Sequence, residues 1–136
     1  MSWFLAKTDP DTYAFAHLER EKRTLWDGVT HPTAVKAIQS MKKGDRVLMY
    51  HSGGESAIVG LARVAASPKP DARNPKSWTV ELECGKRLEP PTTLGEVKAS
   101  GLFADFALVR QGRLSTMPVP EEFIEWLRAR YPKARL

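Results

Sequence analysis

The sequence has a single cysteine, Cys84, among its 136 residues. An internal disulfide or a multi-cysteine zinc site needs more than one thiol, so both are excluded. No apolar run approaches the roughly 20 residues that a membrane-spanning helix needs. The opening residues 1–5 are too soon followed by Lys7 to read as a signal peptide. We therefore expect a protein of the reducing cytoplasm, or of the nucleus if the source is eukaryotic, with no membrane partner.

The sequence also lacks the short motifs of several enzyme classes. It has no glycine-rich loop followed by Lys-Ser or Lys-Thr, no His-Glu-x-x-His, and no cysteine pair of the zinc deaminase type. No spacing gathers His17, His31 and His51 as metal ligands. His51 and Ser52 are adjacent on a predicted strand, where side chains alternate between faces, so they do not form a base and nucleophile pair. We predict no catalytic residue, no metal and no cofactor.

Positive charge is in moderate excess. The sequence has 21 Lys and Arg residues against 16 Asp and Glu residues, which gives a net charge of +5. The first sixty residues nearly balance, with eight basic and seven acidic residues, and the remainder holds thirteen against nine. This excess favours nucleic acid or another polyanion as partner. The length suits one domain over residues 1–136, with no repeat or dividing linker.

Short strands dominate the predicted secondary structure. Apolar runs and alternation predict strands at residues 2–6, 25–26, 45–51, 57–66, 78–84, 107–109 and 114–119. Helices are predicted after a Thr12 cap, from His31-Pro32 to a stop at residues 42–44, from a capping box at residues 93–96, and over residues 121–131. Gly60 inside a strand indicates a bulge or a close backbone approach. The pattern predicts an α+β fold with a curved sheet or small barrel.

Trp26 is the most unusual placement in the chain, because it stands beside a polar Asp27-Gly28 turn and not inside a helix. A tryptophan there can present its ring at the rim of a cavity and stack on something flat. Other polar and aromatic groups also stand at predicted element ends, where binding residues often gather. The candidate ligand-binding residues are Lys7, Thr8, Trp26, Asp27, His31, Tyr50, His51, Ser52, Arg113 and Ser115.

Together these residues supply aromatic faces, hydroxyls, an imidazole and cations. An unstacked nucleobase is read with the same groups, by stacking and by hydrogen bonds to its edge, while cations hold the phosphates. A purely structural interpretation is equally consistent with the spacing. Trp26 could be a core residue, Asp27 a cap, and Tyr50 a buried side chain with a satisfied hydroxyl.

The sequence resembles the EVE domain family over nearly its whole length. The matching blocks are Trp26-Asp27-Gly28-Val29, Met41-Lys42-Lys43-Gly44-Asp45, Tyr50-His51-Ser52, Gly60-Leu61-Ala62-Arg63-Val64 and Arg110-Gln111-Gly112-Arg113-Leu114-Ser115, after a Trp-x-x-x-Lys-Thr-Asp-Pro opening. The resemblance implies a PUA-like mixed β-barrel with flanking short helices, related to the YTH domains. It also implies a non-enzymatic reader of a modified base in DNA or RNA, held in an aromatic-lined pocket.

Under this resemblance Trp26 is one wall of the pocket. Lys7, Thr8 and the block from Tyr50 to Ser52 line it or its mouth, and Arg113 and Ser115 approach from the C-terminal side. One departure concerns the residues after Val29. Many family members continue with Arg-Asn and have Arg where Val35 stands, whereas this sequence reads Thr-His-Pro. The change bears on the identity of the ligand more than on the fold.

Two alternative functions remain open at this point. One is a small-molecule sensor that binds a nucleotide-like ligand in the same cavity. The other is a nucleic-acid-processing enzyme, with His51 and Asp27 as its acid–base groups.

Overall fold

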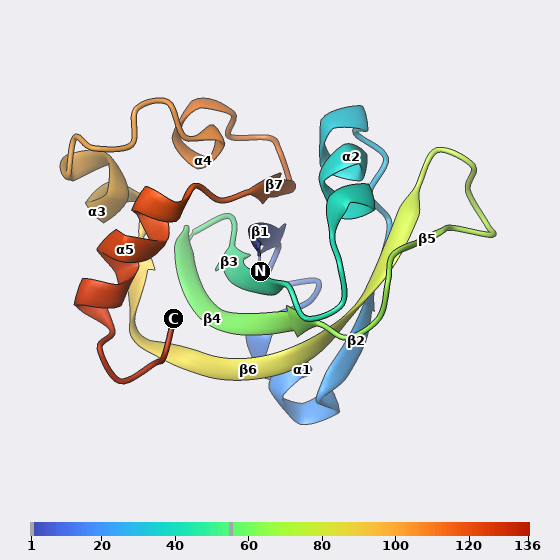
Figure 1. Ribbon diagram of the computed structural model, residues 1–136, viewed down its shortest axis with the longest axis horizontal. Coiled ribbons are helices and arrows are strands. Elements are labelled where there is room, and N and C mark those ends of the chain that lie inside the picture. Colours follow the sequence, from blue (N-terminus) through green and yellow to red (C-terminus); the bar gives the residue numbers. More distant parts are fainter. Residues whose placement is uncertain (1, 55) are drawn as a thin grey trace.

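A curled mixed sheet flanked by short helices forms the centre of the molecule (Figure 1). The computed structural model describes residues 2–54 and 56–136, so residues 1 and 55 lie outside the description. Within these ranges the elements run in the order β1 (Trp3–Thr8), α1 (Phe15–Glu21), β2 (Arg23–Trp26), α2 (Pro32–Ser40), β3 (Arg46–His51), β4 (Ala57–Val64), β5 (Lys69–Pro70), β6 (Trp78–Thr93), α3 (Leu94–Ala99), α4 (Ala107–Arg110), β7 (Thr116–Pro118) and α5 (Glu121–Arg130). The predicted α+β class with a curved sheet is confirmed. No helix in the described ranges is long and apolar enough to cross a membrane.

The strand order is β2-β6-β4-β3-β1-β7, and β5 pairs with the start of β6. Strands β1 and β3 pair in parallel, whereas β1 pairs antiparallel with β7 on its other side. The long strand β6 pairs with β2 along its first part and with β4 along much of its length. In Figure 1 it curves beneath β4 as a long yellow ribbon. Because the sheet curves, residues at the ends of β1 and β2 line the same cavity.

Gly60 interrupts the pairing of β4, as its position in the sequence predicted. The register shifts on both sides of it, between Ile58 and Gly60 and between Gly60 and Ala62. A Cβ atom at this position would lie 2.3 Å from the ring of Phe15, which is 1% exposed. The missing side chain therefore lets the first turn of α1 pack directly on the sheet. His51 fastens the same turn, because its Nε2 accepts a hydrogen bond of 2.9 Å from the Phe15 backbone N–H.

Several predicted element boundaries are wrong, and local chemistry explains each. Helix α1 is capped at Ala14 and not by Thr12, because the Ala14 N–H donates to His17 Nδ1. Helix α2 begins at Pro32 as predicted but ends at Ser40, since the buried Met41 is already extended.

Two strand predictions are also wrong. Residues 107–109 lie in the single-turn helix α4, because a three-residue apolar run that begins with the good helix formers Ala107 and Leu108 fits one turn as well as a strand. Strand β6 continues past residue 84 to Thr93, because pairing with β4 outweighs its glycine and prolines.

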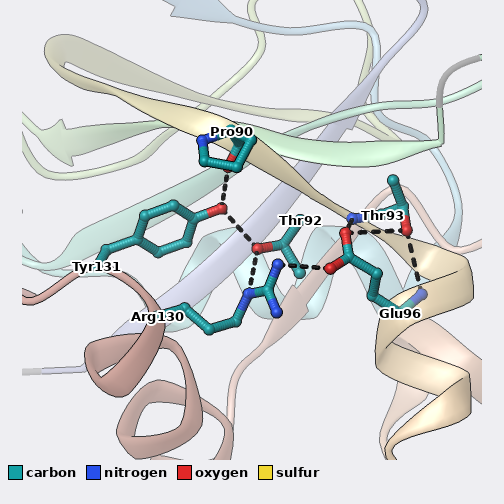
Figure 2. A network of polar contacts seen from close by, with 6 residues as sticks. All are labelled: Pro90, Thr92, Thr93, Glu96, Arg130 and Tyr131. Atoms are coloured by element: carbon teal, nitrogen blue, oxygen red, sulfur yellow. Dashed lines mark hydrogen bonds and ion pairs between the residues drawn. The ribbon is translucent and has the colours of Figure 1, made fainter.

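A partly buried polar network joins the C-terminal helix to the sheet (Figure 2). The Tyr131 hydroxyl donates to the Pro90 carbonyl oxygen and lies 2.6 Å from Thr92 Oγ1. Tyr131 has one hydroxyl proton, so Thr92 is the donor in their shared bond. Arg130 donates from Nε to Thr92 Oγ1 and pairs with Glu96, whose other oxygen accepts from the Thr93 N–H. The predicted capping box of α3 is thus confirmed and tied to the end of α5.

Substitution of Gly60 by Ala is expected to lower the free energy of unfolding by about 1–3 kcal/mol, because the new methyl group overlaps the buried Phe15 ring. Gly95→Ala in α3 is the matched control, since a Cβ there meets no atom closer than 3.8 Å. Urea denaturation of both variants measures the difference. Equal stability of the two variants would contradict the close packing of α1 on β4.

Candidate functional site

A cavity of about 500 Å³ lies where the ends of β1 and β2 meet. Its walls come from the end of β1 and the turn after it, from β2 and the turn after that, and from the residue before β7. The lining residues are Lys7, Thr8, Asp9, Thr12, Tyr13, Thr24, Leu25, Trp26, Asp27, Gly28, Val29 and Ser115. Segments distant in sequence therefore build one concave site.

Trp26 forms one wall, and the sheet fixes it from behind. It is the last residue of β2 and pairs with Val80 of β6. Its indole Nε1 donates a weak hydrogen bond of 3.4 Å to Thr116 Oγ1 on β7. Gly28 then turns the chain at a φ of +73°, a conformation that suits glycine. Trp26 is half-buried and lines the cavity just before this turn.

Tyr13 is a second aromatic residue in the lining, and it is not among the residues predicted from the sequence. Its ring stacks on His17 at 5.4 Å between centroids, and its hydroxyl donates to Glu21 Oε1 at 2.6 Å. Burial and the hydrogen bond with Glu21 raise the pKa of the Tyr13 hydroxyl, which therefore stays neutral. The turn after β1 sets its place, because the Tyr13 N–H donates to the Asp9 carbonyl.

Lys7 brings a positive charge to the lining. Its Nζ donates to the Gly112 carbonyl at 3.0 Å and lies 5.5 Å from the centroid of the Tyr50 ring. Tyr50 is its neighbour in the parallel β1–β3 register, which explains the contact. Burial lowers the pKa of the Lys7 ammonium, because desolvation disfavours its charged form. The Thr8 hydroxyl beside it donates to the Tyr13 carbonyl oxygen.

Asp27 lies at the mouth of the cavity and pairs with a residue distant in sequence. Arg73 Nη2 is 3.2 Å from Asp27 Oδ2. Arg73 belongs to the loop that joins β5 to β6, a segment that the sequence analysis left without a role. Nothing in the sequence of this Pro- and Lys-containing loop predicts that Arg73 pairs with Asp27.

Five of the ten predicted site residues line this cavity, namely Lys7, Thr8, Trp26, Asp27 and Ser115. The others lie outside its lining. Tyr50 is buried beneath Lys7, and His51 is buried behind α1. Ser52 Oγ donates to the Thr8 carbonyl, His31 Nδ1 caps α2 by accepting from the Thr33 N–H, and Arg113 is exposed. The residues from Thr30 to Val35, all within the described ranges, also lie outside the lining.

Metal-binding chemistry has no candidate cluster in the described ranges. Among residues 2–54 and 56–136, no three His, Cys, Asp or Glu side chains gather as ligands. Cys84 is half-buried, and burial raises the pKa of its thiol.

The curled mixed sheet with short flanking helices is the PUA-like architecture. The model of the EVE domain family matches residues 2–130, so the chain belongs to the EVE domain family. This confirms the resemblance found in the sequence blocks.

Solved structures of the same fold come from bacteria and eukaryotes. A protein of Rhodopseudomonas palustris is 31% identical, with 93% of this chain and 90% of that chain covered and a TM-score of 0.87. A Leishmania major protein is 28% identical, with 99% and 98% covered and a TM-score of 0.86. Human THYN1, solved in complex with DNA containing 5-methylcytosine, is 21% identical, with 98% and 99% covered and a TM-score of 0.88. A search among curated proteins finds no significant match.

Lys7 is expected to titrate below the ordinary lysine value of 10.5, because its ammonium is partly desolvated. Between the lowered pKa and 10.5 the unfolded chain binds a proton that the folded chain lacks, so stability rises with pH across that window. An NMR titration of the Lys7 side chain, assigned with Lys7→Arg, measures the midpoint. A midpoint at or above 10.5 would contradict the half-buried position.

Proposed function

We propose that this chain binds nucleic acid and takes one nucleobase into the cavity beside Trp26. The observation that carries the proposal is the gathering of two aromatic rings, Trp26 and Tyr13, with polar groups in one cavity of about 500 Å³. Ligand pockets of this size are ordinary for small planar groups. A base reaches such a site only when it leaves the stack or belongs to a single strand.

The polar lining suits the edge of a base. The Asp27 carboxylate only accepts hydrogen bonds, the Lys7 ammonium only donates them, and the Thr8 hydroxyl does both. Base edges alternate donors and acceptors, so a lining with both kinds can distinguish one base from another. Leu25 and Val29 add apolar surface to the same lining, which a methyl substituent of a base can contact.

The finer part of the proposal is that the base carries a modification. Membership in the EVE domain family supports it, as does the complex of human THYN1, which shares the fold, with DNA containing 5-methylcytosine. We propose binding and not catalysis. Asp27 is ion-paired with Arg73, and His51 lies outside the cavity lining, so the two groups of the enzyme alternative do not meet there.

Trp26→Ala is expected to weaken binding by about tenfold or more, because stacking contributes about 1–3 kcal/mol per base. Trp26→Phe retains a stacking ring and should keep most of the affinity. The measurement is fluorescence anisotropy over DNA and RNA oligonucleotides that carry cytosine, 5-methylcytosine, adenine or 6-methyladenine.

Trp126→Phe on α5 is the matched control, since Trp126 lies outside the cavity lining and should keep wild-type affinity. Circular dichroism confirms that each variant folds. A folded Trp26→Ala protein with unchanged affinity would overturn the assignment of the cavity.

A small nucleotide-like ligand without a phosphate, such as a nucleoside, is the second candidate, and the charge of the cavity favours it. The charged lining residues are Lys7, Asp9 and Asp27, a balance that is slightly negative. The lining alone therefore does not attract a polyanion. A free nucleoside would use the same rings without any phosphate contact.

Salt dependence distinguishes the two candidates. Oligonucleotide binding with three or more phosphate contacts should weaken by about tenfold or more between about 50 and 200 mM salt, because bound counterions are released. Nucleoside binding should be nearly indifferent to salt. Affinity for oligonucleotides that does not change over this range, measured by the same anisotropy assay, would favour the small ligand.

A further inference from the structure

The loop between β5 and β6 brings an arginine to the mouth of the cavity. This hairpin stands away from the rest of the sheet at the right of Figure 1. Arg73 Nη2 contacts Asp27 Oδ2 at 3.2 Å, and Asp27 is part of the cavity lining. The guanidinium therefore lies at the edge of the cavity lining, beside Asp27.

Hydrogen bonds within the loop orient Arg73. The Asp71 carboxylate accepts from the Arg73 backbone N–H at 2.9 Å and lies 3.6 Å from its Nε. The Asp71 side chain is only 9% exposed, and its own backbone N–H donates to the Ser77 carbonyl. Asp71 therefore holds the backbone N–H and the Nε of Arg73, while Nη2 contacts Asp27.

The contact between Arg73 and Asp27 is easily exchanged. The Arg73 side chain is 74% exposed and that of Asp27 is 46% exposed, and ion pairs in such surroundings contribute little. Phosphate is a strong competitor, because guanidinium groups bind it through two parallel hydrogen bonds. The same hairpin also carries the exposed Lys69 and Lys76, so its field attracts phosphate.

We propose that Arg73 binds the phosphate of the nucleotide whose base occupies the cavity, and that it gives up Asp27 in doing so. The released Asp27 carboxylate then accepts a hydrogen bond from an exocyclic amino group, as cytosine and adenine carry. A base that presents a carbonyl there, such as thymine, is repelled. Phosphate binding at the rim and selection of an amino-bearing base in the cavity are thereby coupled. This inference rests on the proposed function.

The test compares ligands that differ only in phosphate. Isothermal titration at low salt uses 5-methyl-2′-deoxycytidine and its 3′- and 5′-monophosphates as probes. The proteins are wild type, Arg73→Gln and Arg63→Gln. Arg63 is the matched control, because it is another exposed, carboxylate-paired arginine, bound to Glu83 and outside the cavity lining.

Wild type should bind one of the monophosphates about three- to fivefold more tightly than the nucleoside, as expected for an exposed charge pair. Arg73→Gln should abolish this preference without weakening the nucleoside, whereas Arg63→Gln should keep it. Thymidine monophosphate should bind wild type more weakly than the 5-methylcytosine analogue.

Three results would overturn the inference. An undiminished preference for the monophosphate in Arg73→Gln would exclude Arg73 as the phosphate ligand. Equal loss of nucleoside and nucleotide binding would mean that Arg73 only shapes the cavity. Equal binding of thymidine monophosphate would exclude the role of Asp27. Absence of binding by wild type to every probe and oligonucleotide would instead refute the proposed function, and the inference with it.

Discussion

Because β1 and β3 pair in parallel, the chain between them must return from one end of the sheet to the other. Such a connection cannot be a tight turn, and it needs a dozen or more residues. Here residues 9–45 make the crossing, and they carry α1, β2 and α2. Most of the cavity lining belongs to the end of β1 and to this crossing segment. The parallel pairing of β1 with β3 therefore accounts for most of the site.

A crossing segment of this length is useful for binding only if it is held in place. Three fastenings do this at different points. The Phe15 ring lies on the bare backbone of Gly60, His51 accepts from the Phe15 N–H, and β2 pairs with β6 up to Trp26. His51 thus acts as a structural contact between the sheet and α1, and Tyr50 supports the Lys7 ammonium from below. Tyr50 and His51 therefore contact residues that form or support the cavity, although neither is part of its lining.

Residues whose roles depend on local pattern could be predicted from the sequence. The Gly60 interruption, the capping box at Thr93 and Glu96, and the tryptophan beside the Asp27-Gly28 turn each leave a local signature. Residues whose roles depend on distant pairing could not. In the sequence Tyr13 is a residue ahead of a helix, and only the turn after β1 brings it into the same lining as Trp26. Arg73 is one of several cations in a loop until the pairing of β2 with β6 brings Asp27 near it. The strand prediction at residues 107–109 was wrong for a different reason, because three apolar residues are too few to show a helical or a strand periodicity.

The distribution of charge also differs from what the net value suggests. Much of the basic excess in the second half is paired with carboxylates, through Arg63 with Glu83, Arg87 with Glu19, Arg128 with Glu121 and Glu125, and Arg130 with Glu96. The charges of each pair largely cancel, so these arginines add little to the electrostatic field around the protein. The cavity itself carries two carboxylates and one ammonium. Under the proposed function the phosphate contacts would lie outside the lining, and the hairpin that holds Lys69, Arg73 and Lys76 is where an arginine contacts a lining residue. In the proposed complex, the base selected inside the cavity and the phosphate bound outside it are coupled through Asp27.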